Sequence, residues 1–196
     1  MSDIEALDGV LCSWLVDGQP RGLSLTKNNH VLVCFSAERR LSEYSPTGRL
    51  IHRINLPVAI DHPWRAVALD ERVWVVSHGS ASSTSASHRV CLIDGQRKQM
   101  TRSYGAAPGA NTCQLNEPRS IIVDCAHRVW VADCCNNRVK VLDKQLDNAQ
   151  ELLNNAEFNK LSGPTCLCLG DDKDGYLFVG QRNGKILVFK VLQAAL

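Results

Sequence analysis

The sequence predicts an all-β protein, a β-propeller with four recognisable blades. One unit, a Pro followed by an alternating apolar segment, occurs four times. The four copies begin at Pro20, Pro63, Pro118 and Pro164. Their period of roughly 45 residues is typical of propeller blades, in which each unit of short strands packs only against its neighbours. A second apolar run and then a basic residue follow each Pro in the same order, which supports one repeated structure.

The first two strands of each repeat are predicted from their apolar patterns. The segment after each Pro alternates between apolar and other residues, as in residues 20–25. The next run is shorter and rich in β-branched and aromatic residues, the composition of a strand buried on both faces. These second strands are expected at residues 31–35, 73–76, 129–132 and 177–180.

A third strand is expected after a basic residue in every repeat. The basic residues are Arg40, Arg89, Arg138 and Lys185. A position filled in every blade usually serves the turn of its own blade, so we interpret this set as structural. The second repeat is lengthened by residues 79–87, which are rich in Ser and have no hydrophobic period. We interpret them as a surface loop.

The chain is predicted to be a single domain, residues 1–196, because no linker or charge run divides it. The last repeat ends after its third strand, while one apolar strand within residues 8–17 precedes the first repeat. That strand could complete the last blade and close the ring, which would remove two unpaired sheet edges. Alternatively it belongs to a missing blade of a larger ring. The repeats span approximately residues 19–57, 62–105, 115–154 and 161–192.

Composition gives little reason to expect an anionic partner or a membrane span. A net charge of +2 is too mild to require nucleic acid or an anionic membrane as a partner. No apolar stretch approaches the roughly 20 residues that span a bilayer, and the acidic N-terminus does not resemble a secretory signal. We expect a soluble, cytoplasmic protein. The nine cysteines are an odd number and are interpreted as reduced core thiols. Five lie in strand-like segments: Cys34, Cys91, Cys125, Cys166 and Cys168.

No motif of an enzyme is present. The chain lacks a Gly-rich phosphate loop, a Gly-x-Ser-x-Gly elbow and a His-Glu-x-x-His helix. The six histidines show no paired spacing and are interpreted as scattered surface residues. We expect no catalytic residue, no metal ligand and no small-molecule cofactor.

The strongest enzymatic alternative is a calcium-dependent propeller hydrolase or lactonase, which needs several oxygen ligands at the central channel. Its contributors would be Asp70, Asp124, Asp133 and Asn136. We favour a role for these side chains in capping turns. An acid does not recur at one strand position, because Ser36, Ser77 and Gln181 stand where the other repeats would match Asp133.

The most promising binding residues follow the repeated Pro. Equivalent positions of a propeller form a ring on one face, and Arg dominates this one. Guanidinium groups bind phosphate or carboxylate in forked geometry, and a neighbouring Trp could stack a base or hold an apolar side chain. Alternatively each Arg donates to carbonyls of the adjacent blade. The candidate ligand-binding rim consists of Arg21, Trp64, Arg65, Arg119 and Thr165.

Two segments of the third repeat carry a family resemblance. Residues 115–118 (Leu-Asn-Glu-Pro) and 131–139 (Val-Ala-Asp-Cys-Cys-Asn-Asn-Arg-Val) resemble an NHL repeat. Residues 39–48 of the first repeat are similar to the degenerate NHL repeats of invertebrate tripartite-motif proteins, and the other two copies are in phase. Full NHL propellers of that family generally have six blades, so the four repeats either close as they stand or belong to a six-bladed ring.

The resemblance implies a non-catalytic interaction module. Proteins with similar NHL repeats use the propeller to hold protein partners or single-stranded RNA, often as the substrate-targeting part of a ubiquitin ligase. The RING and B-box zinc domains of such ligases do not occur in this sequence, so a ligase activity would belong to a parent protein or a partner. We therefore expect a scaffold that binds a protein or single-stranded RNA through one rim. If the ring is incomplete, its open edge should make it self-associate.

Overall fold

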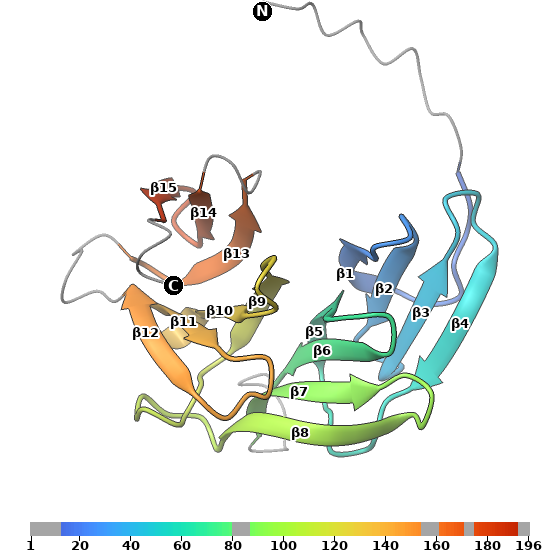
Figure 1. The fold of residues 1–196 in the computed structure, drawn as a ribbon, viewed down its shortest axis with the longest axis horizontal. Helices are drawn as coiled ribbons and strands as arrows, with labels where there is room; N and C mark the ends of the chain where they lie inside the picture. Colours follow the sequence, from blue (N-terminus) through green and yellow to red (C-terminus); the bar gives the residue numbers. More distant parts are fainter. Residues whose placement is uncertain (1–12, 80–86, 154–160, 171–174, 192–196) are drawn as a thin grey trace, which may run out of the picture.

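The computed structural model describes residues 13–79, 87–153, 161–170 and 175–191. These residues form four antiparallel sheets that stand as successive blades around a common centre, as Figure 1 shows. The innermost strands are β1, β5, β9 and β13, which are the strands that begin with the repeated Pro. The predicted four-bladed propeller arrangement is confirmed.

The strands follow one another along the chain within each blade. Blade 1 consists of β1 (Pro20–Leu25), β2 (Val31–Phe35), β3 (Arg40–Tyr44) and β4 (Leu50–Asn55). Blade 2 consists of β5 (Pro63–Ala68), β6 (Val73–His78), β7 (His88–Asp94) and β8 (Gln99–Ala106). Blade 3 consists of β9 (Pro118–Val123), β10 (Val129–Asp133), β11 (Arg138–Leu142) and β12 (Ala149–Leu153). Blade 4 consists of β13 (Pro164–Leu169), β14 (Tyr176–Gln181) and β15 (Ile186–Lys190).

The three inner strands of each blade lie where the apolar runs predicted them. The outer strands β4, β8 and β12 were not predicted. Most of their residues are at least partly exposed and many are polar, as in the sequence Leu-Ile-His-Arg-Ile-Asn of β4. An edge strand with few buried side chains carries little hydrophobic period, so it leaves a weak signal in the sequence.

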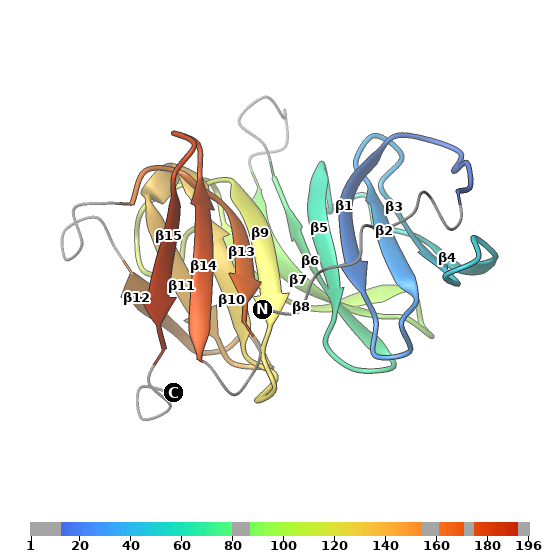
Figure 2. The same ribbon diagram turned by 90° about the horizontal axis from the view of Figure 1, so that it is seen from above.

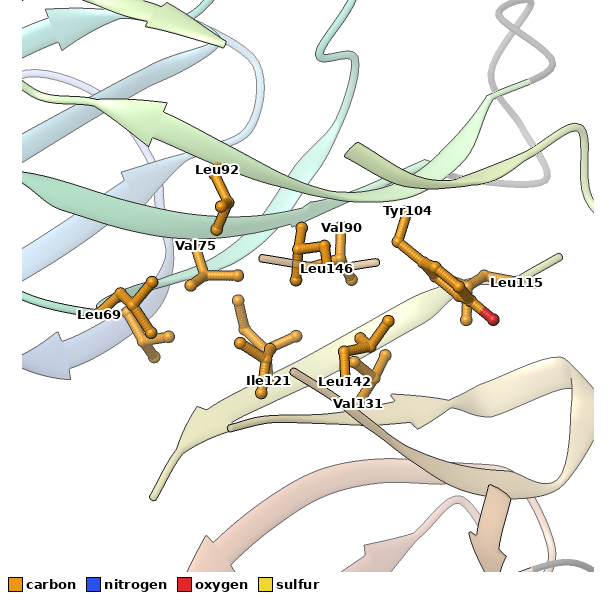
Figure 3. Packing of buried hydrophobic residues seen from close by; sticks show 12 residues of the cluster. Leu69, Val75, Val90, Leu92, Tyr104, Leu115, Ile121, Val131, Leu142 and Leu146 are labelled. Atoms are coloured by element: carbon orange, nitrogen blue, oxygen red, sulfur yellow. The ribbon is translucent and has the colours of Figure 1, made fainter. Parts of the chain in front are cut away.

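The core is divided among the interfaces between blades. Figure 3 shows the interface between blades 2 and 3, where Leu69, Val75 and Leu92 face Ile121 and Leu142. Similar apolar clusters lie between blades 1 and 2 and between blades 3 and 4. Each blade therefore depends on its neighbours for the burial of its two faces.

The ring does not close within the described residues. Blades 1 and 4 lie at the two ends of an open arc (Figures 1 and 2). Of the predicted closing strand at residues 8–17, residues 8–12 lie outside the described residues. Residues 13–17 form no strand, and they lie on blade 1 rather than blade 4, because Trp14 and Val16 pack against its apolar residues. They therefore do not supply a fourth strand to blade 4.

Asp17 fixes this segment to blade 1. Its carboxylate accepts hydrogen bonds from Arg40 Nη1 at 3.0 Å and from Arg53 Nη2 at 2.9 Å. Arg40 also lies over the Phe35 ring, with its Cζ 3.9 Å from the ring centroid. The basic residue that begins the third strand is therefore used structurally in blade 1.

The described cysteines are unpaired, but only some of them are core residues. Cys34 and Cys91 are buried, and burial raises the pKa of each thiol to about 12. The prediction of core thiols is wrong for Cys125, Cys166 and Cys168, which are exposed. Cys125 lies in a turn. The other two lie in β13, on a sheet face that no further blade covers among the described residues.

Two further predictions concern the loop of the second repeat and membrane-spanning segments. Most of the predicted surface loop, residues 80–86, lies outside the described residues. Within the part of the chain that the structure describes, no helix is long and apolar enough to cross a membrane.

Candidate functional site

The first strand of every blade carries a β-bulge directly after its Pro. In blade 1, Pro20 pairs with Phe35 and Gly22 with Cys34, so Arg21 has no partner of its own. The same irregularity recurs in the other three blades. A bulge turns its extra residue away from the regular alternation and is common beside functional sites. The four bulge residues are Arg21, Trp64, Arg119 and Thr165.

Three of these residues, from three consecutive blades, lie in contact. The Cζ of Arg21 is 4.5 Å from the centroid of the Trp64 ring, and the Cζ of Arg119 is 4.8 Å from it. Both distances are within the range of a cation–π interaction. The indole Nε1 donates to the carbonyl of Gly79 at 2.7 Å, which fixes the ring plane. We call Arg21, Trp64 and Arg119 the arginine–tryptophan rim.

The two arginines of the rim differ in their partners. Arg119 donates from Nε and Nη2 to Glu117 Oε2 at 3.0 and 2.9 Å. Arg21 is exposed and contacts no carboxylate among the described residues. The guanidinium of Arg21 therefore keeps donors available for an anionic group from outside the chain.

The other two predicted rim residues do not join this group. Arg65 does not share the bulge position, because it pairs with Ser77 and corresponds to Gly22, Ser120 and Cys166 of the other blades. The interpretation that Arg occupies one equivalent position in three blades is therefore wrong for Arg65. Its Nε is buried without a hydrogen-bond partner. Thr165 occupies the bulge of blade 4 and donates to the carbonyl of Gly180 in its own blade at 3.3 Å.

Glu117, which binds Arg119 of the rim, is a residue that sequence reasoning missed. Its carboxylate accepts from Arg119 and also from Arg182 Nη2 at 2.7 Å, which ties blade 3 to blade 4. Its backbone N–H donates to His88 Nδ1 of blade 2 at 2.9 Å. No repeat pattern marks this contact. Glu117 and Arg182 are far apart in the chain, and the other blades have no Glu or Arg at the equivalent positions.

Glu117 and two neighbouring cysteines bring three possible metal-ligand atoms together. The Glu117 carboxylate and the thiols of Cys134 and Cys135 are within 4.8 Å of one another. Burial raises the pKa of the Cys134 thiol to about 11, so it is protonated at neutral pH. A thiolate is the form that binds metal, and Glu117 is already engaged by two guanidinium groups. These surroundings disfavour a cation.

Two histidines close to the rim are buried, contrary to the expectation of surface residues. His78 and His88 lie at facing ends of β6 and β7, and both side chains are inaccessible to solvent. Burial lowers the pKa of His78 from its usual 6.5 to about 4. A backbone hydrogen bond with Asp61 opposes this shift, but burial outweighs it. The register position of His78 is that of Asp133 in blade 3, since each pairs with the repeated Pro.

Two of the acids considered for a calcium site accept hydrogen bonds within turns of their own blades. Asp70 accepts the backbone N–H of Arg72 and Val73, and Asp124 accepts from Ala126 and Arg128. The register also corrects the expected equivalents of Asp133. Phe35, His78 and Gln181 occupy its position, instead of Ser36, Ser77 and Gln181.

Asp133 belongs to a buried network in blade 3. It accepts from Asn116 N at 2.6 Å, Asn136 Nδ2 at 2.8 Å and Arg138 Nε at 2.7 Å. Arg138 donates further to the carbonyls of Ala110 and Gln114. The basic residue before the third strand thus fastens a loop to blade 3.

A pocket of about 250 Å³ lies at the opposite end of blades 1 and 2, lined in part by His30, Glu43 and Trp74. It is smaller than the 300–1,000 Å³ of typical ligand pockets. His30 Nδ1 and Glu43 Oε1 also satisfy each other at 2.8 Å. The rim is therefore the better candidate site.

One of the four repeats matches a known family model. Residues 115–142 match the NHL repeat. The match covers β9 to β11 of blade 3, the part of the chain in which the resemblance was most complete. No curated protein matches the sequence.

Solved structures share the fold at low sequence identity. Virginiamycin B lyase from Staphylococcus aureus is 16% identical with a TM-score of 0.56, over 90% of this chain and 57% of the lyase. A streptogramin B lyase structure is 14% identical with a TM-score of 0.54, over 90% of this chain and 56% of that one. The computationally designed Ika4 protein is 15% identical with a TM-score of 0.52, over 95% and 96% of the two chains. The chain thus spans a little over half the length of the lyases.

Proposed function

We propose that this propeller is a non-catalytic interaction module that holds an acidic segment of a protein partner against the arginine–tryptophan rim. The observation that carries the proposal is the exposed guanidinium of Arg21, which lies on Trp64 without a carboxylate partner among the described residues. A stacked guanidinium is oriented in advance, so it loses little freedom when a carboxylate binds in forked geometry.

An acidic peptide suits this rim better than single-stranded RNA. Base recognition would use the face of an aromatic ring, but the Trp64 ring already contacts Arg21 and Arg119. A stacked base would have to compete with both arginines. The net charge of +2 is also low for a surface that follows a phosphate backbone. A substrate-targeting role in a ubiquitin ligase, which the family resemblance implies, would use this same rim to hold the substrate.

The calcium-dependent hydrolase has less support. Its candidate ligands Asp70, Asp124 and Asp133 accept hydrogen bonds from backbone or side-chain donors of the chain. Asp70 and Asp124 lie in turns of two different blades, and Asp133 ends β10. Several carboxylates would have to converge on one ion. Low-identity likeness to lyases bears on the fold and does not supply such a site.

Fluorescence anisotropy tests the proposed function. A labelled Glu-rich peptide and a labelled pool of random single-stranded RNA are titrated with the chain at low and physiological salt. The test variant is the double substitution Arg21→Ala and Arg119→Ala. The control is Arg72→Ala with Arg97→Ala, which removes the same charge from turns at the opposite ends of the strands.

We expect the peptide to bind and the rim variant to lose at least tenfold in affinity, about 1.4 kcal/mol, while the control keeps it. Equal weakening in both variants would indicate a nonspecific charge effect and contradict a site at the rim. RNA binding with a steep salt dependence and no peptide binding would favour the RNA-binding alternative and overturn the peptide proposal. Failure of both ligands to bind would remove the rim as a binding site.

A further inference from the structure

The open arc leaves an apolar face at each end. On blade 4, four large hydrophobic side chains of β14 and β15 are exposed: Tyr176, Phe178, Ile186 and Val188. On blade 1, Leu23 and Leu25 of β1 are 57% and 68% exposed. Figure 2 looks onto the open side of the arc, with β14 and β15 on one flank and β1 and β2 on the other. Contiguous exposed apolar side chains on a sheet face mark an interaction surface.

The register shows what the face of blade 4 is built to contact. In blade 3, Ile122 pairs with Trp130, and both pack against blade 4. In blade 4, Cys168 pairs with Phe178 in the same register. Phe178 therefore occupies the position of Trp130, and Val188 that of Val141. The open face of blade 4 repeats the face with which blade 3 receives its following neighbour.

The open face of blade 1 is the other half of the same interface. Leu23 pairs with Val33 as Leu167 pairs with Val179. Leu167 and Val179 are the residues with which blade 4 packs onto blade 3. Leu25 likewise occupies the position of Leu169, and Tyr44 that of Phe189. Blade 1 therefore presents the face that a preceding blade would receive.

A short segment covers part of the blade 1 face. Trp14 and Val16 pack on Val33, Phe35 and Tyr44, which are residues of β2 and β3. The inner strand β1 stays bare, as the exposure of Leu23 and Leu25 shows. Residues 13–17 thus cover the outer part of the face and leave the part nearest the centre of the arc open.

We propose that two copies of this chain close one ring, with blade 4 of each copy packed on blade 1 of the other. The occupant of each open face is a second copy because the two faces are the complementary halves of an interface that the chain already makes between blades 3 and 4. The two-fold axis would run along the central channel, and both joints would be identical. Two four-bladed arcs give eight blades, within the usual range of about 4–8 for propellers.

The first test is the mass of the full chain in solution, measured by size-exclusion chromatography with light scattering at micromolar concentrations. The expected mass is twice the 21.6 kDa of the monomer. Leu25→Lys and Val188→Glu each place a charge in both joints, and each should give a monomer. Val58→Glu changes a more exposed apolar residue outside the two faces and should remain a dimer.

Mixing the two variants shows how the copies are joined. In a mixed pair one joint carries no substitution. The other joint brings the positive charge of the Leu25→Lys copy against the negative charge of the Val188→Glu copy, so the dimer should return. A monomeric wild-type chain would mean that residues 13–17 cap blade 1, which would overturn the proposal. Dimers that survive both substitutions, a mixture that stays monomeric, or an open series of larger species would each contradict the ring.

Discussion

Blades 3 and 4 place equivalent residues in opposite surroundings. Trp130 of blade 3 is 1% exposed, whereas Phe178 at the same register position of blade 4 is 37% exposed. Ser120 of blade 3 is buried, and its counterpart Cys166 is exposed. The presence of a following blade therefore decides how much a given side chain of this repeat contributes to stability.

The largest expected difference concerns the aromatic pair. Trp130→Ala should lower the free energy of unfolding by about 3–5 kcal/mol, because it leaves a cavity between blades 3 and 4. Phe178→Ala should lower it by about 1 kcal/mol, since much of the ring is already in water. Urea unfolding in the Leu25→Lys background, where the proposed dimer is absent and both aromatic sites keep their neighbours, measures both. Equal losses would show that blade 4 is as well covered as blade 3.

A second prediction uses the buried His78, whose position in blade 4 is filled by Gln181. The unfolded chain takes up a proton near pH 6.5, but folded His78 does so only near its pKa of about 4. Its contribution is therefore fully present above pH 6.5 and is lost as the pH falls toward 4, by up to about 3 kcal/mol.

The matched variant for this effect is His78→Gln, because Gln181 occupies the equivalent position in blade 4. The difference in unfolding free energy between wild type and variant should change across this pH range, as followed by urea unfolding at several pH values. A constant difference would mean that His78 titrates normally in the folded chain.

The smallest effect concerns a single hydrogen bond between blades. Ser120 Oγ accepts from Leu167 N at 3.1 Å, and both residues are buried. Ser120→Ala would leave this N–H without a partner and should cost about 1–3 kcal/mol. Cys166→Ala, at the equivalent exposed position, should change stability by less than about 0.5 kcal/mol. Thermal unfolding of the two variants compares them, and a larger loss for Cys166→Ala would contradict the comparison.

Much of the fold could be predicted because the repeated strands are buried, and buried strands have a recognisable apolar composition. The runs at residues 31–35 and 129–132 have the composition of strands covered on both faces, and they became β2 and β10. The outer strand β4 could not be predicted in this way, since few of its side chains are buried. The closing strand was inferred from an apolar pattern. The apolar residues Trp14 and Val16 instead pack on blade 1 without forming a strand.

The candidate site was predictable only where the repeat places residues. Arg21, Trp64 and Arg119 gather because they share one bulge position in consecutive blades. Arg65 differs because it stands two residues after its Pro, beyond the bulge, where it pairs with Ser77. Glu117 and Arg182 meet across blades without any repeated pattern, so only the three-dimensional structure brings them together.

Hydrogen exchange resolved by blade tests most directly whether a covering neighbour decides the stability of each blade. At low protein concentration we predict a lower free energy of opening, and therefore faster exchange, for the amides of β14 and β15 than for those of β10 and β11. At high concentration β1, β14 and β15 should become protected together, because the two open faces cover each other. Uniform protection of all four blades, independent of concentration, would contradict the account.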